Sequence, residues 1–154
     1  MKWVTWEQVG VDRMACAWLL RRFVDEEALF SFVPTGFVPT ERQSWPDDAE
    51  PFDIPGVRYA HHGGHATFST LLRVFHLTDP TLERIARIVD EADTVQEITL
   101  EPTAPGLDTI CRGIRLTSPD DATALERGRL VYDALYAQLT AELATERDEE
   151  PTDR

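Results

Sequence analysis

Apolar residues recur at helical spacing along most of this chain, and this periodicity restricts the fold more than any other feature of the sequence. The first periodic stretch follows Asp12, which we expect near the N-cap of a helix. Its apolar face comprises Cys16, Leu19, Leu20, Phe23 and Val24, spaced i, i+3, i+4, i+7 and i+8. Similar stripes predict four further helices, over residues 67–75, 80–93, 107–114 and 119–143.

Two short segments have the composition of strands. Residues 28–33 and residues 57–60 are apolar and rich in aromatic or β-branched side chains. The stretch 35–51 between them contains several prolines and no periodicity, which is typical of a surface loop. We therefore expect a mostly helical α+β fold, with about five helices and a small strand pair or sheet.

The chain has the size of one domain. Its 154 residues and hydrophobic content of 42% are enough for a core without disulfides. We place the domain at residues 1–145 and expect the acidic tail 146–154 to be disordered, because it has nothing to bury. No stretch approaches the roughly 20 apolar residues of a membrane helix, so we expect a cytoplasmic protein with no membrane partner.

The charge of the chain restricts its partners. Fifteen Lys and Arg stand against 28 Asp and Glu, a formal net charge of −13, which repels the phosphate backbone of nucleic acids. Nucleic acid is therefore excluded as an expected partner. Cys16 and Cys111 are far apart in sequence and lie on apolar helical faces, which fits reduced core thiols in a reducing compartment. Monomer and homo-oligomer both stay open.

Three histidines within five residues are the sharpest chemical feature. His61, His62 and His65 occur in the segment HHGGH, after the second expected strand. Neutral imidazole is the commonest metal ligand in proteins. Successive residues of a strand point to opposite faces, so at most one of His61 and His62 faces the interior, while the glycines let His65 turn back. The segment predicts a metal site; the alternative is a polar loop with a chance run of histidines.

Asp93 is the best candidate for a carboxylate ligand. It continues the apolar stripe of its helix, where an ionised side chain needs a cation or a partner. The alternatives are a pair with Arg13 or Arg87, or exposure at the frayed helix end. Asp90 and Glu91 lie on other faces and should be solvated, although Glu91 could turn inward as the helix ends.

Basic residues near the first helix suggest an anion site. Arg13, with Arg21 and Arg22, could hold an oxyanion or a substrate carboxylate through bidentate hydrogen bonds. Pairing of these arginines with surface acids is the alternative. For Asp12 itself, capping of its own helix is the favoured role.

The segment VDRMACAWLLRRF at residues 11–23 resembles the C-terminal domain of the chromate resistance protein ChrB. Further pieces follow in the same order, and together they cover nearly the whole chain: FDIPG at 52–56, HHG at 61–63, TF at 67–68, LTDP at 77–80, IV at 88–89, ADT at 92–94 and VYDALY at 131–136. Ala17, His65 and Asp90 depart from the common pattern of the family. The resemblance implies a bacterial role in resistance or response to chromate.

The resemblance also implies where the site lies. It points to Asp12, Arg13 and Cys16 as candidate catalytic residues. His62 and Asp93 are the leading metal ligands, with His61, His65 and Glu91 as secondary candidates.

These residues lead us to expect a metal-dependent enzyme, an oxidoreductase or hydrolase. Mixed nitrogen and oxygen ligands favour Fe, Mn or Zn, and the substrate is expected to be an oxyanion, an oxygen species or a small molecule. One alternative is a non-catalytic sensor or binding module for chromate or sulfate. Another is an oxygen-activating tailoring enzyme of small-molecule metabolism, which two or more histidines and one carboxylate on iron would suit.

Overall fold

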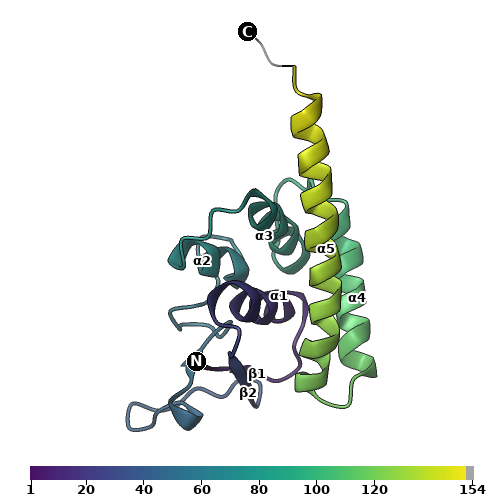
Figure 1. Ribbon diagram of the computed structural model, residues 1–154. Helices are drawn as coiled ribbons and strands as arrows, with labels where there is room; N and C mark the ends of the chain where they lie inside the picture. Colours follow the sequence, from purple (N-terminus) through teal and green to yellow (C-terminus); the bar gives the residue numbers. More distant parts are fainter. Residues whose placement is uncertain (152–154) are drawn as a thin grey trace.

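Helix α1 (Val11–Leu19) lies at the centre of the molecule (Figure 1). The computed structural model describes residues 1–151. Eight of the nine residues of α1 are buried, because four other helices pack around it. These helices are α2 (Thr67–Val74), α3 (Pro80–Asp93), α4 (Thr103–Thr117) and α5 (Asp121–Glu149). The mostly helical α+β fold expected from the periodicity is thus confirmed.

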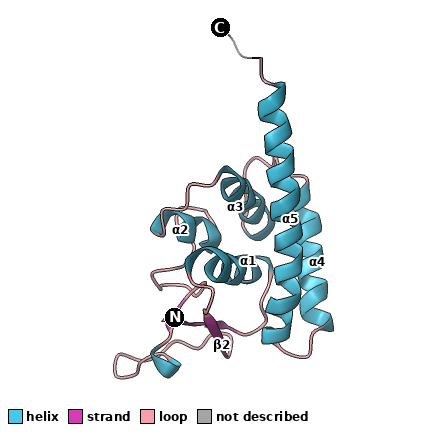
Figure 2. Ribbon diagram, in the orientation of Figure 1, coloured by secondary structure: helices cyan, strands magenta, loops and turns pink. Residues whose placement is uncertain are grey.

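A small sheet lies beside α1 and consists of parallel strands. Its strands are β1 (Lys2–Trp6), β2 (Leu29–Val33) and β3 (Glu50–Pro51), in the order β2-β1-β3. Helix α1 and the π-helical turn η1 (Leu20–Val24) connect β1 to β2, as a parallel pair requires. Figure 2 shows β2 below α1, beside the lower ends of α4 and α5.

The central strand is the element that the sequence analysis missed. In β1 the side chains of Trp3, Val4 and Thr5 are all fully buried, so the strand lacks the alternation that marks a half-buried strand. The prediction of a strand at residues 57–60 is wrong. Tyr59 forms one isolated bridge with Phe52, and no second strand extends the pairing.

Two helix starts also differ from expectation. Gly10, rather than Asp12, is the N-cap of α1, and Ala66, rather than Thr67, is the N-cap of α2. Neither residue supplies a side-chain cap. The loop expected at 35–51 contains the short 3₁₀ helix η2 (Pro46–Asp48) and ends in β3.

Helix α5 is the longest element, and it packs along α4 (Figure 1). Its C-terminal turns extend beyond the other helices. Residues 146–149, the first part of the expected tail, belong to this helix, and residues 152–154 lie outside the described residues. Between residues 1 and 151, none of the helices combines the length and the apolar character of a membrane span.

Candidate functional site

A cavity of about 580 Å³ opens where β1 and β3 end. Strand β1 lies between β2 and β3, and all three strands run parallel, so the order of the strands reverses at β1. Ligands of parallel sheets bind at such a switch point, outside the carboxyl ends of the strands. The cavity is lined by Trp6, Gln8, Gly10, Val11, Asp12, Arg13, Asp53, Ile54, Pro55, Gly56, Val57, Ala60, His61, His62, Asp93, Asp108, Arg112 and Arg115.

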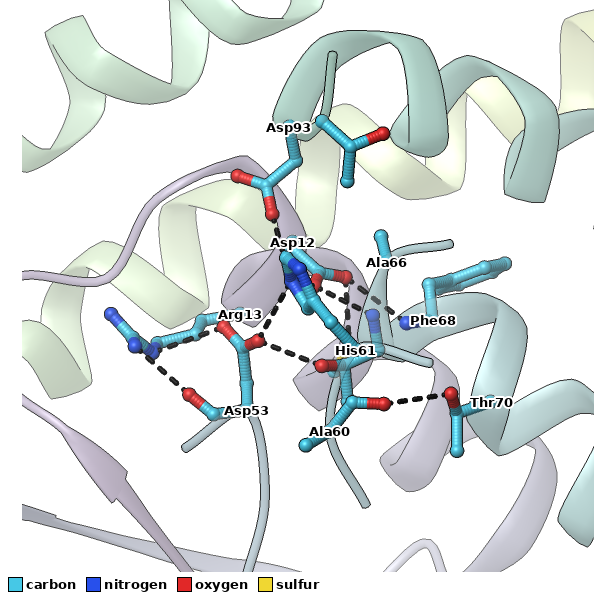
Figure 3. Close-up of polar contacts among 12 residues, drawn as sticks. Asp12, Arg13, Asp53, Ala60, His61, Ala66, Phe68, Thr70 and Asp93 are labelled. Atoms are coloured by element: carbon cyan, nitrogen blue, oxygen red, sulfur yellow. Dashed lines mark hydrogen bonds and ion pairs between the residues drawn. The ribbon is translucent and has the colours of Figure 1, made fainter. Parts of the chain in front are cut away.

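His61 lies among three carboxylates in this cavity (Figure 3). Its Nε2 atom is 3.0 Å from Asp12 Oδ2, 3.1 Å from Asp93 Oδ2 and 3.3 Å from Asp53 Oδ1. One atom each from Asp12, His61 and Asp93 lie within 4.8 Å of one another, a spacing that could hold a metal ion. These three side chains come from α1, from the loop before α2, and from the end of α3.

The carboxylate of Asp12 is buried and held by the N-terminus of α2. Its Oδ2 accepts a hydrogen bond from Thr67 N at 2.9 Å, and its Oδ1 accepts one from Phe68 N at 3.1 Å. The sequence predicts that Asp12 caps its own helix, α1. In the structure Asp12 instead caps the N-terminus of α2. The partial positive charge of that helix end favours the ionised carboxylate.

Asp53 is fixed by a cation and a hydroxyl. Arg13 Nε lies 3.1 Å from Asp53 Oδ2, and Arg13 Nη2 donates to the Asp53 carbonyl oxygen at 2.9 Å. Thr67 Oγ1 donates to Asp53 Oδ1 at 2.7 Å. Arg13 thus offsets the charge of Asp53, while Asp53 Oδ1 remains 3.3 Å from His61 Nε2.

Crowding of these acids changes their protonation. Burial raises the pKa of Asp93 to about 7, and the charges of Asp12 and Asp53 add to the effect. Burial also raises the pKa of Asp12, followed by repulsion from Asp53, while the hydrogen bonds from His61 and Thr67 oppose the shift. Burial and mutual repulsion thus disfavour ionisation of Asp12 and Asp93, and groups with perturbed pKa values in a cavity are typical of functional sites.

The imidazole responds in the opposite direction. Its hydrogen bonds to Asp12 and then Asp53 raise the pKa of His61 to about 10, against a smaller opposing effect of burial. In the metal-free protein His61 is therefore protonated at neutral pH. A metal ion at Nε2 would displace this proton, as metals generally do at their ligands.

Local backbone contacts bring His61 to the site. Asp53 N donates to the Tyr59 carbonyl oxygen at 2.7 Å, and Thr70 Oγ1 donates to the Ala60 carbonyl oxygen at 2.7 Å. These bonds fix the residues that precede His61 against the Asp53 turn and against α2.

A tight turn keeps the other two histidine rings away from Asp12 and Asp93, although His62 still lines the cavity. His62 and His65 exchange both backbone hydrogen bonds, and Gly63 and Gly64 between them have φ of 60° and 79°. A two-residue turn of this type needs positive φ at both central positions, which explains the two glycines. His62 Nε2 lies 3.2 Å from the Arg58 carbonyl oxygen. The position beside Asp93 that the sequence analysis gave to His62 is occupied by His61.

His65 belongs to a second polar group, around Asp90. Its Nδ1 lies 2.6 Å from Asp90 Oδ2, while Asp90 Oδ1 accepts from Ala66 N at 2.8 Å and from Ser69 Oγ at 3.0 Å. The expectation that Asp90 is solvated is wrong, because its carboxylate is buried at the start of α2. His65 is therefore not brought to Asp93.

Glu91 and Cys16 lie outside the cavity lining. Both carboxylate oxygens of Glu91 accept backbone hydrogen bonds, from Leu100 N and Glu101 N, so Glu91 holds the loop before α4. Cys16 is fully buried behind Asp12, with Sγ 3.4 Å from Asp12 Oδ1, and does not line the cavity. Burial and the neighbouring carboxylate of Asp12 raise the pKa of this thiol, so Cys16 is a poor nucleophile.

The three arginines expected to act together are divided between two places. Arg13 lines the cavity, whereas Arg21 and Arg22 line a separate hollow and pair with Glu126 and Asp133 of α5. The alternative stated for Arg21 and Arg22, pairing with acids, is what the structure shows. The prediction that all three guanidinium groups form one anion site is therefore wrong.

Sequence reasoning missed three cavity residues. Asp53 lies in a turn, where an acid is ordinary, although that turn belongs to the segments that resemble ChrB. Arg112 and Arg115 lie on α4, with nothing in the local sequence to mark them. Only the packing of α4 beside the end of α3 brings them to the cavity.

Comparison with known proteins agrees with the resemblance in the sequence. Residues 3–139 match the family model of the C-terminal domain of ChrB. Protein ChrB of Cupriavidus metallidurans is 33% identical over 141 residues, which cover 91% of this chain and 41% of that protein. The chain thus spans less than half the length of this relative. No solved structure matches significantly. The chain belongs to the ChrB C-terminal domain family.

Proposed function

We propose that this chain is a metal-dependent enzyme in which Asp12, His61 and Asp93 hold an Fe, Mn or Zn ion. The observation that carries the proposal is the convergence of these three ligand atoms within 4.8 Å, from three separate segments, in an open cavity. A ligand set with three protein groups in an accessible cavity leaves coordination positions for water or substrate.

The charges of the cluster support a cation at this place. Asp12, Asp53 and Asp93 face His61, and Arg13 compensates only Asp53. One imidazolium cannot donate its single Nε2 proton to three carboxylates at once. A divalent ion on neutral His61 would balance Asp12 and Asp93 fully, which protonation of His61 alone does not.

The donor types favour particular metals. Two carboxylates and one imidazole suit Mn, Fe or Zn, because imidazole favours transition metals and carboxylates favour harder ions. Such an ion supplies Lewis acidity, activation of bound water or redox chemistry. The chain's own residues orient the ligands: the N-terminus of α2 holds Asp12, and Arg13 with Thr67 holds Asp53 against His61.

Membership of the ChrB family suggests the biological context. The proposed role is in the response to chromate, with an oxyanion or a small molecule as substrate. The oxygen-activating tailoring enzyme rested on two or more histidines at one iron. That premise has no support here, because the cluster contains one imidazole.

A second candidate function is binding of an oxyanion without catalysis. It is favoured by the guanidinium groups of Arg112 and Arg115 in the cavity wall, and by a His61 that is protonated without metal. In that case the three aspartates and His61 form only an ionic cluster.

Elemental analysis separates the two candidates. Protein purified without a histidine tag should contain about one equivalent of Fe, Mn or Zn, and His61→Ala should contain almost none. His62→Ala is the matched control, because it removes the adjacent imidazole, which bonds only to the Arg58 carbonyl oxygen. Equal metal content in wild type and His61→Ala would contradict the proposal. Metal-free protein that gains thermal stability with sulfate would favour the binding module.

A further inference from the structure

We propose that the cavity binds an organic anion with an apolar body, and that Arg112 and Arg115 hold its anionic group. This inference names the substrate class of the proposed enzyme and rests on that function. The anionic group is a carboxylate, phosphate or phosphonate. Each of these groups offers paired oxygen atoms that a guanidinium group can bind with two parallel hydrogen bonds.

One face of α4 supplies the cationic wall. Asp108, Arg112 and Arg115 are spaced i, i+4 and i+7, so their side chains project from the same side of the helix, and all three line the cavity. Arg112 uses its Nε to bond Asp108 Oδ2 at 2.9 Å. That bond leaves the two terminal nitrogens of Arg112 for a ligand, with no partner in residues 1–151.

Arg115 gives the stronger indication of a bound anion. Its side chain is half-buried and, within the described part of the chain, makes no ion pair or hydrogen bond. Acids outnumber bases in this chain by 28 to 15, so an arginine in a cavity without an acidic partner is unexpected. A bound anion would give this guanidinium the partner that the protein does not supply.

The size of the cavity argues against a bare inorganic oxyanion as its whole content. The volume of about 580 Å³ lies within the range of roughly 300–1,000 Å³ for small-molecule sites. A tetrahedral oxyanion has a single central atom and four oxygens, so it fills a small part of this space. A larger molecule can contact the metal ligands and the α4 wall together.

The remaining walls suit an apolar body. Trp6, Pro55 and Val57 present accessible apolar surface to the cavity, with the buried side chains of Val11 and Ile54 beneath it. The Trp6 ring is fixed from two sides: its Nε1 donates to the Phe37 carbonyl oxygen at 2.8 Å, and the Arg13 guanidinium lies 5.9 Å from the ring centroid. A fixed aromatic wall buries ligand surface at little entropic cost.

The charge of the loaded cavity also favours an anion. Four carboxylates line it, from Asp12, Asp53, Asp93 and Asp108, together with three guanidinium groups, from Arg13, Arg112 and Arg115. With a divalent ion on neutral His61 the net charge becomes positive. An anionic group would restore neutrality.

Calorimetric titration of the Mn²⁺-loaded protein tests the inference. The probes are phenylphosphonate, phenylacetate and inorganic phosphate, and the variant is Arg112→Gln/Arg115→Gln. The control Arg147→Gln removes an exposed arginine near the end of α5, away from the cavity. We expect at least one of the two aromatic anions to bind wild type and Arg147→Gln at least tenfold more tightly than the double variant, and more tightly than phosphate binds wild type.

Metal content measured on the same samples separates this inference from the proposed function. The double variant should keep its Mn²⁺, because neither arginine is a ligand. If wild type retains Mn²⁺ but neither aromatic anion binds, or the double variant binds them equally well, the anion site is overturned and the metal site stands. Phosphate binding as tight as that of the aromatic anions would also overturn it. If wild type retains none of Mn²⁺, Fe²⁺ and Zn²⁺, the proposed function fails, and titration of that metal-free protein still decides the role of the arginines.

Discussion

His61 is the residue on which the account of the site depends. Its side chain is 43% exposed, yet Nε2 lies within 3.3 Å of three carboxylates. The neighbours of His61 in sequence, which have the same chemistry, do not share this environment. His62 meets a carbonyl oxygen and His65 meets Asp90. The environment of each histidine is therefore set by its position relative to the turn, and the clustering of histidines in the sequence does not reveal it.

The raised pKa of His61 predicts how the stability of the metal-free protein changes with pH. The pKa is about 10 in the folded protein and 6.5 for the unperturbed group. A raised pKa means that His61 stabilises the fold fully below pH 6.5, and that this contribution is lost as the pH rises towards 10. The urea midpoint of metal-free wild type should therefore fall more steeply from pH 6.5 to 10 than that of His61→Gln. Parallel midpoints for the two proteins would contradict the ion cluster.

At the residue scale, the sequence predicts which types of residue meet in the cavity better than which individual residues do. Histidine and Asp93 could be selected because dense imidazole and an acid on an apolar stripe are both unusual. The choice of His61 over His62 could not be made, because it depends on the path from Tyr59 to the Gly63-Gly64 turn. Asp53 could not be selected either, since its role comes from contacts with Arg13 and Thr67 that are distant in sequence.

Among the elements, α2 shows how the helices depend on one another. Its N-cap, Ala66, has no capping side chain, and its first amides are bound by Asp12 of α1 and Asp90 of α3. The start of α2 therefore forms only when α1 and α3 are in place. Because Asp12 is also a candidate ligand, packing of these helices and formation of the site are the same event.

Helices α1 and α5 approach closely at Gly128, and this contact predicts a difference between two glycines. A Cβ added at Gly128 would lie 3.0 Å from Met14 Sδ and 3.3 Å from Met14 Cβ, whereas one added at Gly113 of α4 meets nothing within 4 Å. Both positions are helical, so alanine gains roughly 0.5–1 kcal/mol of helix propensity at each. Gly113→Ala should be more stable than wild type by about that amount, and Gly128→Ala should not be.

Urea denaturation of the two variants measures this difference directly. The pair is matched, because the substitution and the type of element are identical and only the buried neighbour Met14 differs. Equal stabilisation in both variants would show that α1 and α5 are less closely packed than described.

Secondary structure could be predicted where one face of an element is buried. Helices α3 and α5 have this property, and their stripes predict them, whereas α1 is predicted from its apolar spacing although it is buried on nearly every side. Strand β1 is buried on both sides at Trp3, Val4 and Thr5, so no alternation reveals it. Residues 57–60 have the right composition for a strand, but composition does not supply a pairing partner.

At the scale of the whole molecule, the cavity results from several separate parts of the chain. The ends of β1 and β3 form its base, the end of α3 supplies Asp93, and α4 supplies Arg112 and Arg115. Parallel order in the sheet places the first two at one edge, as in other parallel sheets. The contribution of α4 depends on tertiary packing, which is why its arginines were not expected from the sequence.

The projecting end of α5 predicts that the chain can be shortened there without loss of stability. Residues 144–151 are exposed and lie beyond the helices that pack on α5 (Figure 1). Removal of residues 144–154 should change the free energy of unfolding by less than about 0.5 kcal/mol, as for other surface changes. Urea denaturation of the shortened chain checks this expectation. A loss of several kcal/mol would show that the end of α5 stabilises the domain.

The most direct test of the metal site is anomalous X-ray scattering from crystals of the Mn²⁺-loaded protein. The account predicts one anomalous peak, within coordination distance of His61 Nε2 and of carboxylate oxygens of Asp12 and Asp93. The same peak should be absent from crystals of His61→Ala. No peak in the wild-type cavity, or a peak held by His62 and His65 at the glycine turn, would contradict the account.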